Sequence, residues 1–212
     1  MELTIPVRQD SVWAEHLAGD GVPIVLLHPG TGDSRYWDLV LPGLDGRRVL
    51  RYDVRGYGRS PRPTAEFSLR EDLETVLDQL ELEKVLLVGC SMGGSTALSE
   101  ALANPDRVHG LVLLCPGVPG FPVPPEPDLD PQCDVLSEYL KADAPVYDRL
   151  QEIQVPSGVI VGDRDRPILA AVAGATAARI PGCEFIWMPG IDHLPNLRDP
   201  QLVTETILRF AG

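Results

Sequence analysis

The stretch that decides the fold is Val85-Leu-Leu-Val-Gly-Cys-Ser-Met-Gly-Gly94. Its apolar start predicts a buried strand, Gly89-x-Ser91-x-Gly93 predicts a very tight turn, and the small residues that follow predict the start of a helix. The two glycines allow the chain to approach itself closely on either side of the serine. A helix N-terminus also directs N–H groups at developing negative charge. The stretch therefore indicates that Ser91 is a nucleophile, with a purely structural glycine-rich turn as the alternative.

Further apolar runs, each followed by a turn signal, recur along the chain. The expected strands are Ile24–Leu27, Val49–Tyr52, Val85–Val88, Val108–Leu114, Gly158–Val161 and Phe185–Met188. Runs this continuous are typical of parallel strands that are covered on both faces. The expected helices are 69–80, which a capping box of Ser68 and Glu71 begins, then Met92–Ala103, Ile168–Ile180 and Pro200–Phe210, and residues 3–7 and 12–17 are expected to form a hairpin. The alternation of strand and helix predicts an α/β fold, with a mostly parallel central sheet flanked by helices.

Composition narrows the class of protein. The 212 residues fit one domain, 1–212, and the net charge of −13 disfavours a nucleic-acid partner and an anionic membrane surface. The sequence shows no secretory signal and no membrane-spanning run, so a cytoplasmic location is expected. Cys90, Cys115, Cys133 and Cys183 have no C-x-x-C pairing, which favours buried free thiols over disulfides or a metal.

Proline is abundant, with 21 residues in the chain, and it is densest between Pro116 and Pro131. That segment cannot be a regular helix or a central strand. It lies in a stretch of chain that leaves the sheet between two expected strands. We expect residues 118–153 of this stretch to form a reduced lid, with helical turns near 135–141 and 146–153. A surface loop without function is the alternative. A lid this short predicts a relatively open site.

Five motifs in order resemble the α/β-hydrolase family, in its serine hydrolase branch. They are His28-Pro-Gly-Thr-Gly32, Asp53-Val-Arg-Gly-Tyr-Gly-Arg-Ser60, Gly89–Gly93, Gly162-Asp-Arg-Asp165 and Asp192-His-Leu-Pro195. The resemblance covers nearly the whole chain, and each motif follows an expected strand. It implies the α/β-hydrolase fold and a triad of serine, acid and histidine in that chain order. We expect Asp53–Ser60 to tie a turn rather than to catalyse, and Trp37 to pack in the core.

The serine needs a base, and four histidines are available. His193 follows the last expected strand in a loop that can bring the imidazole over Ser91, so it is the expected base. His28 is expected to hold the backbone of the loop that contains it, and His16 and His109 are expected to be surface or packing residues.

The base in turn needs a carboxylate that fixes its tautomer. Asp163 and Asp165 both follow the strand Gly158–Val161, and the resemblance assigns the second, Asp165, as the acid. Asp163 would then shape its own turn, and Asp192, next to His193, would shape the histidine loop. In some relatives the acid follows the preceding strand, where this chain has Cys115-Pro116 and no carboxylate.

An oxyanion hole needs two N–H donors. The expected donors are the backbone N–H groups of Met92 and Gly30, because Pro29 replaces the residue that usually donates and has no N–H. Thr31 is a weaker candidate donor.

The expected activity is hydrolysis of carboxylic esters or lactones of small to medium apolar substrates through an acyl-enzyme on Ser91. A pocket is expected from Pro29, Thr31, Met92, Val118, Phe121 and Leu194. Alternatives are a C–C bond hydrolase, a thioesterase, a cofactor-free perhydrolase or a non-catalytic ligand-binding protein. No cofactor or metal is implied, the expected partner is a small-molecule ester or acyl substrate, and the sequence does not indicate an oligomeric state.

Overall fold

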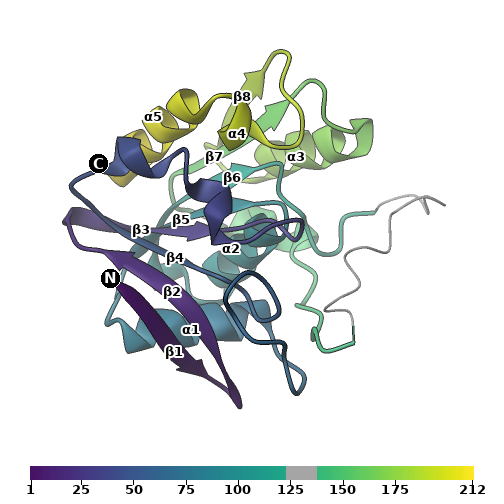
Figure 1. Cartoon of the computed structure of the whole chain (residues 1–212). Coiled ribbons are helices and arrows are strands. Elements are labelled where there is room, and N and C mark those ends of the chain that lie inside the picture. Colours follow the sequence, from purple (N-terminus) through teal and green to yellow (C-terminus); the bar gives the residue numbers. More distant parts are fainter. Residues whose placement is uncertain (123–137) are drawn as a thin grey trace.

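The structure, a computed structural model, describes residues 1–122 and 138–212 (Figure 1). An eight-stranded sheet forms its centre, in the order β1-β2-β4-β3-β5-β6-β7-β8. The strands are β1 (Glu2–Val7), β2 (Asp10–Leu17), β3 (Asp20–Leu27), β4 (Arg47–Tyr52), β5 (Val85–Cys90), β6 (Val108–Leu114), β7 (Ser157–Gly162) and β8 (Glu184–Met188). Strands β3 to β8 pair in parallel, whereas β1 and β2 pair antiparallel, as the expected hairpin at the sheet edge. The mostly parallel α/β fold is therefore confirmed.

Helices cover both faces of the sheet and bury two apolar clusters. They are α1 (Leu69–Gln79), α2 (Met92–Ala103), α3 (Pro167–Arg179), α4 (Pro195–Arg198) and α5 (Pro200–Ala211), with short 3₁₀ helices η1 (Ser34–Trp37), η2 (Leu41–Leu44), η3 (Pro105–Arg107) and η5 (Tyr147–Glu152). Helices α1, α2 and α3 pack on one face, and α5 packs with η1 on the other. Ser68 begins α1 as expected, since its side chain accepts from the Glu71 N–H. Among the described residues, no helix is long and apolar enough to cross a bilayer.

Parallel strands bring distant parts of the sequence to one edge. The residues that follow β3, β5, β6, β7 and β8 all leave the sheet at its carboxyl edge, because these strands run in the same direction. This edge is where ligands bind in open α/β sheets. The loops that contain His28, Ser91, Cys115, Asp165 and His193 therefore meet there.

The segment expected to be a lid is irregular where the structure describes it. Residues 123–137, including Cys133 and most of the expected turn at 135–141, lie outside the described residues. The chain returns beside Phe67, whose N–H donates to the Tyr139 carbonyl and whose carbonyl accepts from the Lys141 N–H. The expected helix at 146–153 is a 3₁₀ helix, η5 (Tyr147–Glu152), whose N-cap residue makes no side-chain hydrogen bond. The lid itself stays a prediction.

Candidate active site

Ser91 lies at the turn between β5 and α2 in a conformation that few residues adopt. Its φ of 49° and ψ of −109° lie outside the strand and helix regions. Three backbone hydrogen bonds hold it there: its N–H donates to the Leu114 carbonyl at 3.0 Å, and its carbonyl accepts from Ser95 at 3.0 Å and from Gly117 at 2.9 Å. The neighbouring strand and the following helix thus fix a partly exposed hydroxyl at the sheet edge.

The two glycines of the turn are required by close backbone approach. A Cβ on Gly89 would overlap the carbonyl of Gly93, and a Cβ on Gly93 would overlap the carbonyl of Leu27. The first contact lets the helix start directly over the strand, and the second packs it against β3. The sequence pattern around Ser91 is therefore a steric requirement of this turn.

The structure brings His193 to Asp165. His193 Nδ1 lies 2.8 Å from Asp165 Oδ2, and the other carboxylate oxygen accepts from the Arg166 N–H at 2.7 Å. The Asp165 carboxylate is 1% exposed and the imidazole is 27% exposed. Burial alone would raise the pKa of Asp165, but the imidazole and the nearby Cys115 thiol outweigh it, so the pKa lies below the usual value. Asp165 is thus an ionised acceptor that orients the ring.

The neighbouring aspartates make other contacts. Asp163 is exposed and accepts from the Gly190 N–H at 2.6 Å, so it links its turn to the loop after β8 rather than closing its own turn. Asp192 accepts from the Leu194 N–H at 3.0 Å and pairs with Arg198 at 2.6 Å, which lowers the pKa of Asp192. Of the three carboxylates, Asp165 is the one that contacts the His193 ring.

Ser91 and His193 share the carboxyl edge of the sheet without a direct hydrogen bond among the described residues. In ligand-free enzymes the bond between nucleophile and base is often long, and it shortens when substrate binds. The geometry is therefore that of a serine with an oriented imidazole on the same edge.

The two expected oxyanion-hole donors, Gly30 and Met92, lie close together in the structure. A Cβ on Gly30 would lie 3.6 Å from Met92 Sδ, so the loop after β3 lies close to the start of α2. Among the described residues, neither the Gly30 nor the Met92 N–H donates to a protein acceptor. Pro29, which precedes Gly30, is buried and has no N–H, and Thr31 is exposed.

His28 fixes the loop that contains Gly30. Its Nδ1–H donates to the Pro29 carbonyl at 2.9 Å, and its Nε2 accepts from the Val54 N–H at 3.0 Å. Both nitrogens are thus used, which confirms the expected structural role. Burial lowers the pKa of His28, because the loss of water around the charged ring outweighs the hydrogen bond to the Pro29 carbonyl and the attraction of Asp53.

The motif Asp53–Ser60 also has the expected structural role, with one difference. Asp53 accepts from the N–H groups of Ser34 and Arg59, both at 2.8 Å, and so ties the turn. Arg55 does not tie it. It reaches helix α1 and pairs with both oxygens of Asp72, because a buried guanidinium needs a carboxylate partner. Trp37 is fully buried in the core, as expected.

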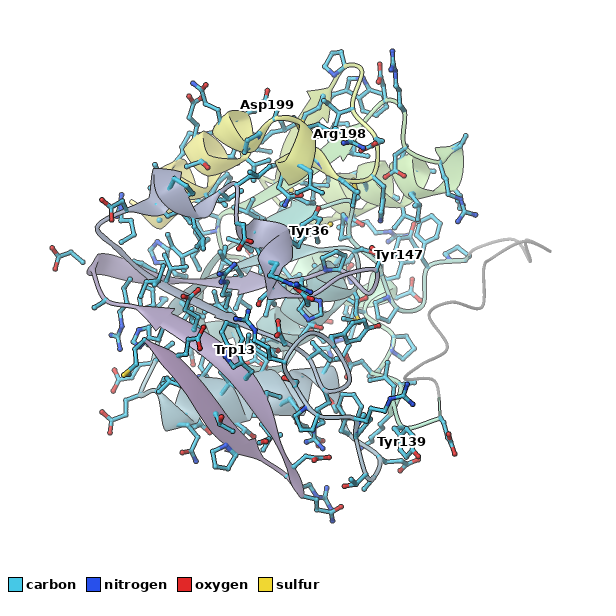
Figure 2. All side chains as sticks on the ribbon, in the orientation of Figure 1. Trp13, Tyr36, Tyr139, Tyr147, Arg198 and Asp199 are labelled. Atoms are coloured by element: carbon cyan, nitrogen blue, oxygen red, sulfur yellow. The ribbon has the colours of Figure 1, made fainter. Side chains whose placement is uncertain are left out.

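The expected pocket residues lie around this edge. Val118 and Phe121 are half-buried, and the Phe121 ring packs on Tyr147 with centroids 4.9 Å apart (Tyr147 is labelled in Figure 2). Leu194 is half-buried in the loop after His193. The cavity beneath Met92 measures about 10 Å³, too small for a substrate, and is lined by Leu27, His28, Tyr52, Val54, Met92, Gly93 and Thr96.

Three contacts near the sheet edge were not predicted from the sequence. Asn196 is fully buried, and its Nδ2 donates to the Tyr36 carbonyl at 2.5 Å, which ties the histidine loop to η1. Figure 2 shows Tyr36 below helix α4 in that view, and its hydroxyl donates to Cys90 Sγ, next to Ser91, at 3.1 Å.

Cys115 follows β6 and lies near Asp165 and His193. The strand order places Cys115 there, because β6 lies between β5 and β7, and the sequence alone does not give that order.

With this geometry established, comparisons identify the class of protein. The family model for the alpha/beta hydrolase fold matches residues 22–139. The chain therefore belongs to the α/β-hydrolase fold family.

Particular relatives span several hydrolase activities. The chain is 39% identical to 2-hydroxymuconate semialdehyde hydrolase of Pseudomonas sp. (strain CF600), over 51% of this chain and 41% of that protein. It is 31% identical to a putative non-heme chloroperoxidase of Synechocystis sp., over 87% of this chain and 73% of that protein. A solved structure of an N-acyl homoserine lactone degrading enzyme matches with a TM-score of 0.83 and 25% identity, over 98% and 100% of the two chains. The alignments span 37% to 45% of the length of the first curated relatives.

Proposed function

We propose that the protein is a serine hydrolase that cleaves carboxylic esters or lactones of small to medium apolar substrates through an acyl-enzyme on Ser91. The observation that carries the proposal is the His193–Asp165 pair at 2.8 Å, on the same sheet edge as the strained Ser91 turn. A serine hydroxyl is a poor nucleophile at neutral pH and gains reactivity only when a base stands beside it.

Each residue has a distinct role in the proposed first step. Ser91 Oγ attacks the carbonyl carbon while His193 Nε2 accepts the hydroxyl proton. Asp165 accepts from Nδ1–H, which leaves the Nε2 lone pair toward the serine and stabilises the imidazolium that forms. The oxyanion of the tetrahedral intermediate accepts hydrogen bonds from the N–H groups of Gly30 and Met92.

The second step returns the enzyme to its starting state. His193 gives its proton to the leaving alcohol, and the acyl group stays on Ser91. A water molecule then transfers a proton to His193 as it attacks the acyl carbon. When the second tetrahedral intermediate collapses, the bond from the acyl carbon to Ser91 Oγ breaks, His193 returns its proton to Ser91 Oγ, and the acid is released.

The carboxylate must remain ionised throughout this cycle. The lowered pKa of Asp165 supports that requirement, since it keeps the carboxylate charged at neutral pH. Its side chain is 1% exposed, so its attraction for the imidazolium is weakly screened by solvent.

The substrate class rests on the extent of the lid and on similarity. A reduced lid over residues 118–153 would leave Ser91 accessible to varied esters, with Pro29, Thr31, Val118, Phe121 and Leu194 as the proposed contacts. The similarity to a lactone-degrading enzyme over almost the whole of both chains supports including lactones. We propose one domain, 1–212, with a small-molecule ester as its partner.

A C–C bond hydrolase is the second candidate. The observation that favours it is the 39% identity to 2-hydroxymuconate semialdehyde hydrolase, although that alignment covers 51% of this chain. The same three side chains would serve either reaction. A thioesterase or a cofactor-free perhydrolase uses the same chemistry, and the similarity to a putative chloroperoxidase supports testing the perhydrolase.

Turnover of a substrate panel tests the proposal. The panel holds p-nitrophenyl esters of increasing chain length, lactones, an acyl thioester and a vinylogous 1,5-diketone of the type cleaved by C–C hydrolases. We expect turnover of short and medium esters or of lactones, and its loss in Ser91→Ala. Rates equal to those of Ser91→Ala across the panel would contradict an enzymatic role, and cleavage of the diketone alone would select the second candidate.

A further inference from the structure

Cys115 occupies a position at the sheet edge that the proposed reaction does not use. It is the first residue after β6, which lies between β5, the strand before Ser91, and β7, the strand before Asp165. It is 1% exposed and has a φ of 43°, a left-handed conformation that its N–H stabilises by donating to the Ile160 carbonyl at 2.9 Å. The backbone thus holds this thiol inward, beside the acid.

Three metal-binding side chains converge here. Cys115 Sγ, a carboxylate oxygen of Asp165 and a ring nitrogen of His193 all lie within 4.8 Å of one another. Bonds of about 2.0–2.3 Å to a tetrahedral zinc ion place ligand atoms about 3.3–3.7 Å apart. The three atoms could therefore close around one ion with side-chain shifts of about 1 Å.

The donor set favours particular ions. A thiolate and an imidazole prefer Zn²⁺ and its softer analogue Cd²⁺, whereas Mg²⁺ and Ca²⁺ prefer all-oxygen sites. One thiolate and one carboxylate also balance the double charge of the ion in a buried site. The imidazole is the most exposed of the three side chains, at 27%, so its side of the site is open to a water as fourth ligand.

We propose that Cys115, Asp165 and His193 form an inhibitory site for a thiophilic divalent cation such as Zn²⁺. The inhibition rests on the proposed function, whereas the binding does not.

Coordination of the ion explains how it would inhibit the proposed reaction. The ion displaces the thiol proton, which passes to solvent, and forms bonds to sulfur, to the carboxylate oxygen and to one ring nitrogen. If that nitrogen is Nδ1, the ring proton resides on Nε2. If it is Nε2, the lone pair is already used. In both cases His193 cannot accept the Ser91 proton, and Asp165 no longer orients the ring.

Cadmium absorption tests the binding directly. Apo protein, reduced and freed of metal, is titrated with Cd²⁺ while thiolate-to-cadmium charge-transfer absorption is recorded in the ultraviolet. We expect one equivalent to bind and the band to be lost in Cys115→Ala. His193→Ala should weaken binding by at least about tenfold to a hundredfold, since loss of even an outer-shell partner of a metal ligand has an effect of that size. The matched control is Cys183→Ser. Cys183 directly precedes β8, at the edge of the sheet opposite to the site, so this variant should keep the band.

The same proteins separate binding from function. With the substrate that the panel identifies, Zn²⁺ should inhibit the wild type and Cys183→Ser alike, and a chelator should restore activity. Retention of the Cd²⁺ band in Cys115→Ala, or absence of any band in the wild type, would overturn the site. Binding without ester turnover would instead leave the site standing and contradict the proposed function.

Discussion

The nucleophile and its base are held by different kinds of contact. Ser91 is fixed by backbone: three main-chain hydrogen bonds and two glycines that leave no room for a side chain. His193 lies on a loop after β8 and is held by side chains, through Asp165 at its ring and Asn196 three residues on. The turn around Ser91 should therefore tolerate almost no substitution, whereas the histidine loop depends on a few polar contacts that can be removed one at a time.

The largest effect should come from the side chain that holds the base. Asp165→Asn should lower kcat by about 10³–10⁴-fold, because the amide favours the wrong imidazole tautomer. The matched variant Asp163→Asn changes an exposed carboxylate but keeps a side-chain oxygen that can accept from the Gly190 N–H, so it should stay within about threefold of wild type. Steady-state kinetics of the two variants on one ester show which aspartate is the catalytic acid. Loss of activity in Asp163→Asn alone would make the assignment of Asp165 wrong.

Two glycine substitutions test whether close backbone approach fixes the turn around Ser91. Gly93→Ala should destabilise the fold by about 3 kcal/mol, because the new methyl group overlaps the Leu27 carbonyl. Gly174→Ala, in helix α3, has no heavy atom within 4 Å of the new methyl group and should stabilise by about 0.5–1 kcal/mol. Urea unfolding measures both, and equal effects would show that close approach does not explain Gly93.

A smaller effect should follow from loosening the histidine loop. Asn196→Asp replaces the Nδ2 donor with a carboxylate facing the Tyr36 carbonyl, which should cost about 1–3 kcal/mol of stability. It should also lower kcat more than it changes KM, because the loop positions the base rather than the substrate. The surface control Gln201→Glu, in the exposed part of α5, should change stability by less than about 0.5 kcal/mol. An unchanged kcat in Asn196→Asp would separate that residue from the base.

The smallest effect concerns pH and the loop that contains Gly30. Burial lowers the pKa of His28 below its ordinary value of 6.5, so below about pH 6.5 the unfolded chain binds a proton that the folded protein does not. Stability should therefore fall with decreasing pH, by up to about 1.4 kcal/mol per unit for one such group. His16, less buried and with its pKa also lowered, should contribute less.

The free energy of unfolding, measured from pH 7.5 to pH 5, tests this pH dependence. Its fall with decreasing pH should be reduced more in His28→Gln than in His16→Gln. Equal slopes in wild type and His28→Gln would show that His28 is not the group responsible.

Much of this architecture could be predicted from the sequence because local pattern and global fold agree. Apolar runs gave the strands, and the glycines around Ser91 gave the turn, since both depend on residues next to one another. The contact of Arg55 with Asp72, the tie from Asn196 to Tyr36 and the place of Cys115 could not be predicted in the same way. They join segments far apart in the chain, and they depend on side-chain reach across the sheet edge.

The most direct test of the central claim is covalent labelling of the nucleophile. The protein is treated with a p-nitrophenyl phosphonate ester and analysed by intact-mass and peptide mass spectrometry. The account predicts one adduct per chain, on the peptide containing Ser91, with labelling abolished in Ser91→Ala and strongly slowed in His193→Ala. No adduct, or an adduct that persists in Ser91→Ala, would contradict the assignment of Ser91 as the nucleophile.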